Sequence, residues 1–338
     1  MRKVAVLLSF VLICSCLDSN RNLEQITLRG STMGTSYNIK IIVSRTAGID
    51  QNQLHETVKQ ELQNINQLVS TYIEDSELSG FNQFGETEWF PVSKDLVDIM
   101  ATAIDISRKS GGAFDITVGP LVNLWGFGPE HQRDEIPDAR EIERRKTKVG
   151  YQLITVREDP PALYKTRSDV YCDLSAIAKG WGVDVIAQLL QSKKFHHYLV
   201  EIGGEVRARG YNFKGKPWQI GVSSPDEQFG IQRVIPLKDL SVATSGDYRN
   251  YFEKGGVRYS HTIDPRTGRP ITHNLVSVTV LHESCMIADA YATAIDVLGY
   301  QEGLQLAERE NLAVLMITKQ DSGFVETTST RFETRIPN

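Results

Sequence analysis

The sequence lacks the features that would assign it to several common classes of protein. It has no basic tract and a formal net charge of −5, so we expect no nucleic-acid partner, because binding a phosphate backbone needs clustered Lys and Arg. The phosphate-binding pattern G-x-x-x-x-G-K-[ST], the zinc-protease pattern H-E-x-x-H and the serine-hydrolase pattern G-x-S-x-G do not occur. With 41% hydrophobic and 23% charged residues, the chain has the composition of an ordinary globular protein.

Cysteine is also scarce, and two of the four cysteines lie near the N-terminus. The other two, Cys172 and Cys285, are far apart in sequence, and one distant pair is weak evidence for a disulfide. We therefore expect two small buried side chains at these positions. A redox link between them remains the alternative.

The N-terminus differs from the rest of the chain. Arg2 and Lys3 precede an apolar run that is shorter than the roughly 20 residues needed to span a membrane, which is typical of a signal peptide. The run ends in Ile13-Cys14-Ser15-Cys16, which resembles a bacterial lipobox with the lipid attached to Cys16. A plain secretory signal with an incidental cysteine is the alternative.

This interpretation divides the chain into three parts. Residues 1–15 form a lipoprotein signal peptide, residues 16–25 a tether, and residues 26–338 one functional domain. We expect an exported protein that is anchored by its lipid to a bacterial membrane and faces the periplasm.

The hydrophobic pattern predicts a domain of the α+β class. Apolar residues at helical spacing predict helices in the ranges 54–69, 96–107 and 177–189, and residues 76–82 are predicted as a loop. Short alternating runs predict strands, for example 33–43, 196–202 and 276–282, and residues 254–256 predict a hairpin turn. The elements do not follow a strict βαβ rhythm, so we predict antiparallel sheets with packed helices rather than a parallel sheet.

The stretch from Asp173 to Gly180 predicts a strand that leads directly into a helix. Ser175 is a plausible N-cap, and the free N–H groups at a helix start suit a phosphate. Asp173 and Lys179 place opposite charges around this turn. An ordinary connection with a solvated lysine is equally compatible with this stretch alone.

Two further groups of polar residues could carry chemistry. Asp289 and Thr293 are four residues apart, so on a helix they share one face and offer the hard oxygen ligands that Mg²⁺ accepts. His261 precedes Asp264 and Arg266, which combines a proton acceptor with a phosphate-binding guanidinium. Without further context, the first pair could be an ordinary helical turn and the second group a polar turn.

These stretches together resemble the ApbE family, the FAD:protein FMN transferases. The resemblance covers roughly residues 30–318, and no single motif carries it. In chain order the motifs are Met33-Gly34-Thr35 with Tyr37, Ser70-Thr71-Tyr72, Ala113-Phe114-Asp115, Asp173–Gly180, Gly203-Gly204, Thr244–Tyr248, His261–Gly268 and Asp289–Thr293.

The resemblance implies a mixed, T-fold-like α+β domain and a specific reaction. Such an enzyme uses FAD as substrate with Mg²⁺, and it transfers the FMN half to a Ser or Thr hydroxyl in a flavinylation-type motif of an acceptor protein, releasing AMP. An FAD pyrophosphatase and a lipid-anchored flavin carrier remain alternatives.

The resemblance also implies roles for individual residues. Asp289, Thr293 and the carbonyl of Ala176 would hold Mg²⁺. His261 would act as general base, and Asp264 would orient it. The residues implied to bind FAD are Met33, Tyr72, Ala113, Phe114, Asp115, Asp173, Lys179 and Ile263.

Overall fold

A computed structural model describes residues 22–128, 135–224, 230–246, 251–254, 257–321 and 323–336. The expected signal peptide and Cys16 lie outside these residues. So do parts of the expected 244–248 motif and of the turn around residues 255–256. Among the described residues, no helix combines the length and apolar character needed to cross a membrane.

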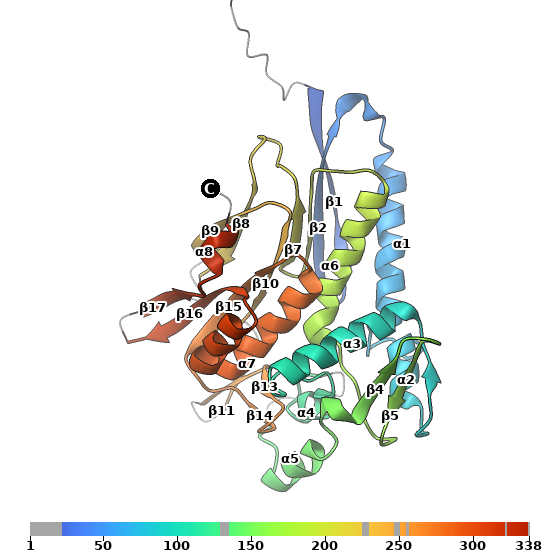
Figure 1. Cartoon of the computed structure of the whole chain (residues 1–338), viewed down its shortest axis with the longest axis vertical. Coiled ribbons are helices and arrows are strands. Elements are labelled where there is room, and N and C mark those ends of the chain that lie inside the picture. The colour runs from blue at the N-terminus through green and yellow to red at the C-terminus, as the bar shows by residue number, and fades with distance from the viewer. Residues whose placement is uncertain are drawn as a thin grey trace, which may run out of the picture.

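The centre of the fold is an eight-stranded sheet in which every pair of neighbours is antiparallel (Figure 1). The strands are Leu23–Thr32 (β1), Thr35–Ser44 (β2), Tyr198–Ile202 (β6), Glu205–Arg209 (β7), Leu240–Ser245 (β10), Leu275–His282 (β15), Ala313–Gln320 (β16) and Gly323–Thr328 (β17). Their order across the sheet is β1-β2-β6-β7-β10-β15-β16-β17. The predicted antiparallel α+β class is therefore confirmed.

The long helices cover one face of this sheet. The helices of the described residues are Gln51–Val69 (α1), Glu77–Gln83 (α2), Lys94–Lys109 (α3), Gly119–Leu124 (α4), Ala139–Lys146 (α5), Ser175–Ser192 (α6), Cys285–Arg309 (α7) and Phe332–Arg335 (α8), of which α8 lies on the opposite face. Figure 1 shows α1, α6 and α7 side by side against the strands, with α3 crossing in front of α6 and α7. The three long helices predicted from apolar spacing correspond to α1, α3 and α6.

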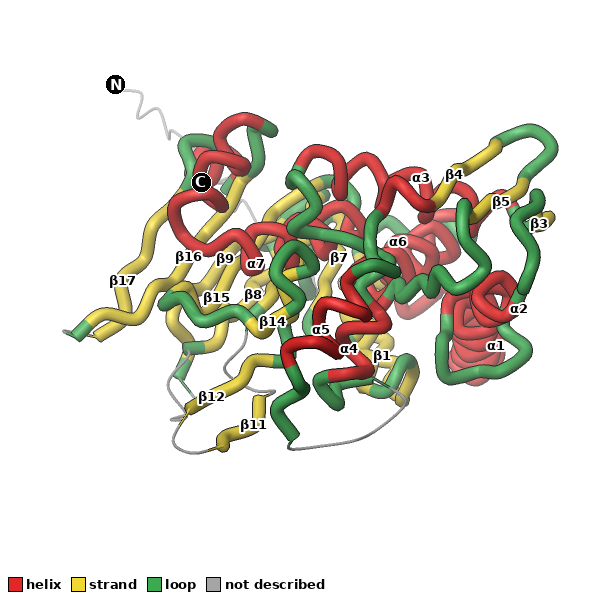
Figure 2. The backbone as a smooth tube through the Cα atoms, turned by 90° about the horizontal axis from the view of Figure 1, so that it is seen from below, coloured by secondary structure: helices red, strands yellow, loops and turns green. Residues whose placement is uncertain are grey.

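Short strands outside this sheet complete the molecule, three of them in one small sheet and the rest in pairs. They are Phe90–Pro91 (β3), Ile154–Arg157 (β4), Ala162–Lys165 (β5), Trp218–Ser223 (β8), Ile231–Leu237 (β9), Tyr251–Lys254 (β11), Val257–Ser260 (β12), Ile263–Asp264 (β13) and Arg269–Pro270 (β14). In Figure 2 the β11–β12 hairpin stands out beside α4 and α5, and its aromatic side chains pack on the residues of that region.

Alternation along the strands divides the core into two layers. On β15, Val278 and Val280 face the helices, whereas Leu281 faces the other side. A register shift between Leu275 and Ser277 interrupts the alternation, so that Leu275 packs with the helices and Val276 with the other core. Adjacent side chains of a strand point to opposite faces, so one strand supplies both cores. The second core is covered by β8, β9 and α8, and the sheet is thus buried on both faces over much of its area.

Three boundaries differ from the sequence predictions. Strand β1 begins at Leu23, so residues 23–25 belong to the sheet and not to the expected tether. Met33 and Gly34 form the turn between β1 and β2, with φ of 50° and 70°, where the sequence predicted strand. Helix α2 occupies a stretch predicted as loop, and Ser76 caps it by accepting the N–H of Ser79. Its seven residues give too short an apolar pattern to separate helix from turn.

The closest contact between α6 and α7 depends on Gly180. A Cβ added there would lie 2.4 Å from the carbonyl oxygen of Cys285 and 2.8 Å from Cβ of Asp289. Both are closer than non-bonded atoms approach, so a larger residue would force the two helices apart. Glycine at this position therefore sets the spacing of the helices.

We predict that Gly180→Ala lowers the free energy of unfolding by about 1–3 kcal/mol, because the gain in helix propensity does not offset overpacking. The matched control is Gly182→Ala on the same helix, whose added Cβ meets its nearest atom, Cε of Met33, at 3.5 Å. Urea unfolding measures both. Equal stability of the two variants would contradict the close-contact account.

Candidate active site

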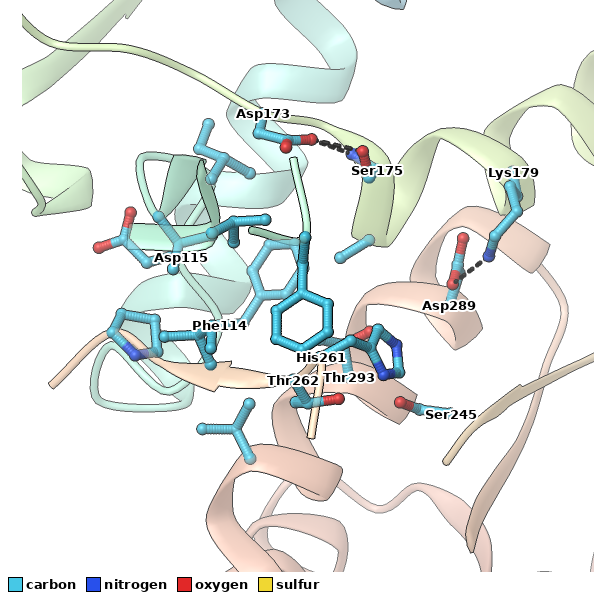
Figure 3. Close-up of a pocket in the computed structure, with 18 of the residues that line it drawn as sticks. Phe114, Asp115, Asp173, Ser175, Lys179, Ser245, His261, Thr262, Asp289 and Thr293 are labelled. Carbon is cyan, nitrogen blue, oxygen red and sulfur yellow. Dashed lines mark hydrogen bonds and ion pairs between the residues drawn. The ribbon is translucent and has the colours of Figure 1, made fainter. Parts of the chain in front are cut away.

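One cavity of about 400 Å³ lies where the first turns of α6, the middle of α7 and the loops beside them meet. Segments far apart in the sequence line it, among them 113–118, 203–205, 244–246 and 261–263. Figure 3 shows the labelled polar residues around this space, with Asp289 and Lys179 on one side and Asp115 on the other. The sheet and the helix pair thus gather polar groups that the sequence keeps apart.

The charged side of the cavity is built around Asp289. Its Oδ2 accepts the backbone N–H of Gly180 at 2.9 Å, and its Oδ1 lies 3.6 Å from Nζ of Lys179. Lys179 Nζ donates to Oε1 of Glu205 at 2.8 Å. One ammonium therefore lies between carboxylates from two different elements, β7 and α7.

Burial and the neighbouring opposite charges shift the pKa values of Glu205 and Lys179 together. Burial raises the pKa of Glu205 to about 7, and the charge of Lys179 offsets part of that rise. Burial alone would lower the pKa of Lys179, but Asp289 and Glu205 together raise it above its usual value. Lys179 therefore carries its positive charge throughout the physiological pH range.

Glu205 was not predicted from the sequence. It directly follows the Gly203-Gly204 pair, where φ values of 60° and 104° turn the chain from β6 into β7. The sequence offered one clue to a functional role for Glu205: a charged residue begins an otherwise buried strand directly after the glycine pair. Its side chain is almost completely buried.

The residues expected to hold a metal meet at this end of the cavity. Asp289, Thr293 and Ala176 all line it. The N–H of Gly180, one helical turn after Ala176, donates to Oδ2 of Asp289 and fixes that carboxylate beside the start of α6. A backbone carbonyl has two lone pairs, so Ala176 can offer one to a cation even when it accepts a helical hydrogen bond, and the three groups fit a hard divalent ion.

A metal at this position would rely on few side-chain ligands. The described residues contain no cluster of three or more His, Cys, Asp or Glu side chains arranged to bind a metal. A carboxylate, a hydroxyl and a carbonyl suit Mg²⁺, which completes its shell with water and substrate oxygens.

The start of α6 is capped differently from the prediction. Ser175 is the first residue of the helix rather than its N-cap, and Leu174 occupies the cap position without a side-chain bond. Oδ1 of Asp173 accepts both the N–H of Ser175, at 2.8 Å, and its hydroxyl (Figure 3). Asp173 therefore satisfies the end of the helix beside the cavity.

Asp115 lines the cavity, but its carboxylate is used within the protein. It accepts the N–H and the hydroxyl of Thr117 at 2.8 and 2.6 Å, and the N–H of Tyr151 at 2.7 Å. Burial raises the pKa of Asp115, and these hydrogen bonds oppose the rise. Its main structural effect is to fix the 113–118 loop against the cavity.

His261 lines the cavity, and its ring meets the Phe127 ring edge-on with centroids 6.3 Å apart. The carboxylate of Asp264, which was expected to orient His261, is hydrogen-bonded to Arg266. Both oxygens of Asp264 accept from Arg266, at 3.0 Å each from Nε and Nη2, and Asp264 does not line the cavity. Asp264 thus forms a local ion pair, because Arg266 is only two residues away and reaches it within the same turn.

Most of the other residues expected to bind FAD line the same cavity. Tyr72, Ala113, Phe114 and Ile263 do so, and Tyr72 stands at its edge with 68% of its surface exposed. Met33 is the exception among the FAD set. Its side chain packs on the main core near Gly182, because it sits in the β1–β2 turn.

Comparison with known proteins agrees with this arrangement. The model of the ApbE family matches residues 33–316. The chain belongs to the ApbE family. A Vibrio cholerae protein named FAD:protein FMN transferase is 47% identical over 98% of this chain and 97% of its own length, and an Escherichia coli K12 protein of the same name is 42% identical over 92% and 89%.

The fold of the ApbE family is shared as well. The solved structure of the flavin transferase ApbE from Vibrio cholerae has a TM-score of 0.86 and 46% identity, covering 92% of this chain and 99% of that one.

Cys172 and Cys285 are free and buried in this chain, as their spacing predicted.

We predict that Asp173→Ala lowers the free energy of unfolding by about 1 kcal/mol, whereas Ser175→Ala costs clearly less, because the Asp173 carboxylate and not the Ser175 hydroxyl accepts the N–H at the start of the helix. Asp173→Asn should keep most of the stability, since its amide oxygen can accept the same bond. Chemical denaturation of the three variants compares them. If Ser175→Ala lost more stability than Asp173→Ala, the Ser175 hydroxyl would be the group that caps the helix, as the sequence predicted.

Proposed function

We propose that this protein transfers the FMN moiety of FAD to a Ser or Thr hydroxyl of an acceptor protein, with Mg²⁺, forming a phosphoester and releasing AMP. The observation that carries the proposal is that one cavity brings together Asp289, Thr293 and Lys179 with His261. A buried carboxylate, a half-buried hydroxyl, a fixed ammonium and an imidazole are the groups that transfer at a pyrophosphate requires. The names of the relatives support the same activity.

The reaction follows from these groups. The acceptor oxygen attacks the phosphorus that bears the riboflavin side of FAD, and the bond from that phosphorus to the bridging oxygen breaks. His261 accepts the hydroxyl proton, and AMP leaves with the bridging oxygen. Lys179 places positive charge next to the phosphates, and the N-terminus of α6 adds partial positive charge. Bound Mg²⁺ would neutralise negative charge on the pyrophosphate oxygens.

The remaining wall of the cavity suits the rings of FAD. Phe114, Ile116 and Val118 are apolar, and the volume of about 400 Å³ falls in the range of small-molecule sites. Carbonyl and N–H groups of the 113–118 loop, held by Asp115, would meet the polar edges of a ring. Binding would then orient the pyrophosphate toward Asp289.

The first test is the intact mass of an acceptor domain that carries a flavinylation-type Ser/Thr motif, after incubation with the protein, FAD and Mg²⁺. We predict a mass increase equal to one FMN phosphoester, lost when EDTA removes the metal. Free FMN and AMP with an unmodified acceptor would instead establish a pyrophosphatase, since water would replace the hydroxyl. FAD that stays intact and bound would indicate a carrier.

The same assay tests the proton acceptor. His261→Ala should retain FAD binding but lose transfer by about 10²-fold or more, the range of general base catalysis. His196→Ala is the matched control, because this exposed residue does not line the cavity. Normal transfer by His261→Ala would overturn the assigned role.

We also propose that the protein is exported and held at a bacterial membrane, facing the periplasm, by lipid on Cys16. The support is the sequence before this cysteine. We predict that Cys16→Ser moves the protein from the membrane fraction to the soluble fraction and abolishes labelling with a radioactive fatty acid. Unchanged membrane association would contradict the anchor.

A further inference from the structure

Glu205 occupies a position that the proposed reaction does not yet explain. The residue is 3% exposed, and only one of its two carboxylate oxygens has a partner. Oε1 accepts from Lys179, whereas Oε2 is buried without a hydrogen-bond partner among the described residues. Leaving a buried acceptor unsatisfied lowers stability, so the position of Glu205 calls for an explanation.

The geometry around Lys179 shows what Glu205 does. Its Nζ is 2.8 Å from Glu205 but 3.6 Å from Oδ1 of Asp289, and only the first distance is that of a hydrogen bond. Oδ2 of Asp289 is already engaged by Gly180. Oδ1 is therefore the oxygen that remains for a cation, and Lys179 lies next to it.

An ammonium in this place has two possible effects on a metal. If it hydrogen-bonded directly to Asp289, it would neutralise the carboxylate and compete with the divalent ion. Held at a greater distance, it leaves the carboxylate oxygen available and still faces the cavity. The difference depends on which carboxylate holds Lys179 more closely.

We propose that Glu205 is a positioning residue that holds the Lys179 ammonium away from Asp289 and so keeps Oδ1 free to bind a divalent cation. This inference rests on the proposed function, in which Asp289 is a metal ligand. Glu205 acts through Lys179 and does not contact the metal. Its removal should therefore matter only while the lysine is present.

The test is the affinity for Mn²⁺, which shares the preference of Mg²⁺ for oxygen ligands, measured on the full-length chain from the signal of the free ion in electron paramagnetic resonance. Glu205→Gln should weaken Mn²⁺ binding about tenfold, the lower end of the effect of residues that support metal ligands. In a Lys179→Met background, the same Glu205→Gln change should have no effect. Thermal unfolding of each variant confirms that the chain remains folded.

Glu326→Gln is the matched control, because Glu326 is also an ion-paired glutamate but contacts Arg233 away from the cavity. It should bind Mn²⁺ as the wild type does. If Glu205→Gln weakens binding equally with and without Lys179, Glu205 acts on the metal itself and the inference is wrong. If the wild type binds Mn²⁺ and Glu205→Gln binds it equally well, only this inference fails. A wild type without Mn²⁺ affinity overturns the metal site of the proposed function as well.

Discussion

The site depends on the close approach of α6 to α7 at Gly180. The absence of a side chain there lets the backbone of α6 reach the carboxylate of Asp289, and the N–H of Gly180 then fixes one oxygen of that carboxylate. A substitution of Gly180 would therefore displace the carboxylate of Asp289, which is expected to hold the metal.

A second contact between the same helices fixes where α7 begins. Asp184, one turn after Gly180, is buried and accepts the hydroxyl of Ser284 at 2.7 Å and the N–H groups of Cys285 and Met286 at 3.0 and 3.1 Å. A carboxylate at a helix N-terminus satisfies free N–H groups and complements the helix dipole. Asp184 also pairs with Arg207 on β7, so the start of α7 is tied to both α6 and the sheet.

Local patterns made much of this arrangement predictable. The helix faces of α1, α3 and α6 followed from apolar spacing, and the oxygen pair Asp289 and Thr293 followed from a separation of one helical turn. Both patterns depend only on neighbours in the sequence, so they can be recognised without knowledge of the fold.

What the sequence could not predict depends on partners far along the chain or on competition between near neighbours. Glu205 acquires its role only because β7 places it against Lys179 from α6. The family resemblance implied that Asp264 orients His261, but the carboxylate pairs with Arg266, whose guanidinium is a strong partner two residues away. Ser175 has the ideal chemistry of an N-cap, yet it is the first residue of the helix, and its own N–H donates to Asp173 two residues earlier.

The proposed reaction depends on a metal held by Asp289. Anomalous scattering from crystals grown with Mn²⁺ and FAD would locate that metal. We expect a peak at about 2 Å from Oδ1 of Asp289, from the Thr293 hydroxyl and from the Ala176 carbonyl, adjacent to the pyrophosphate. A metal bound only to the pyrophosphate, with none of these three groups in contact, would show that Asp289 is not a ligand.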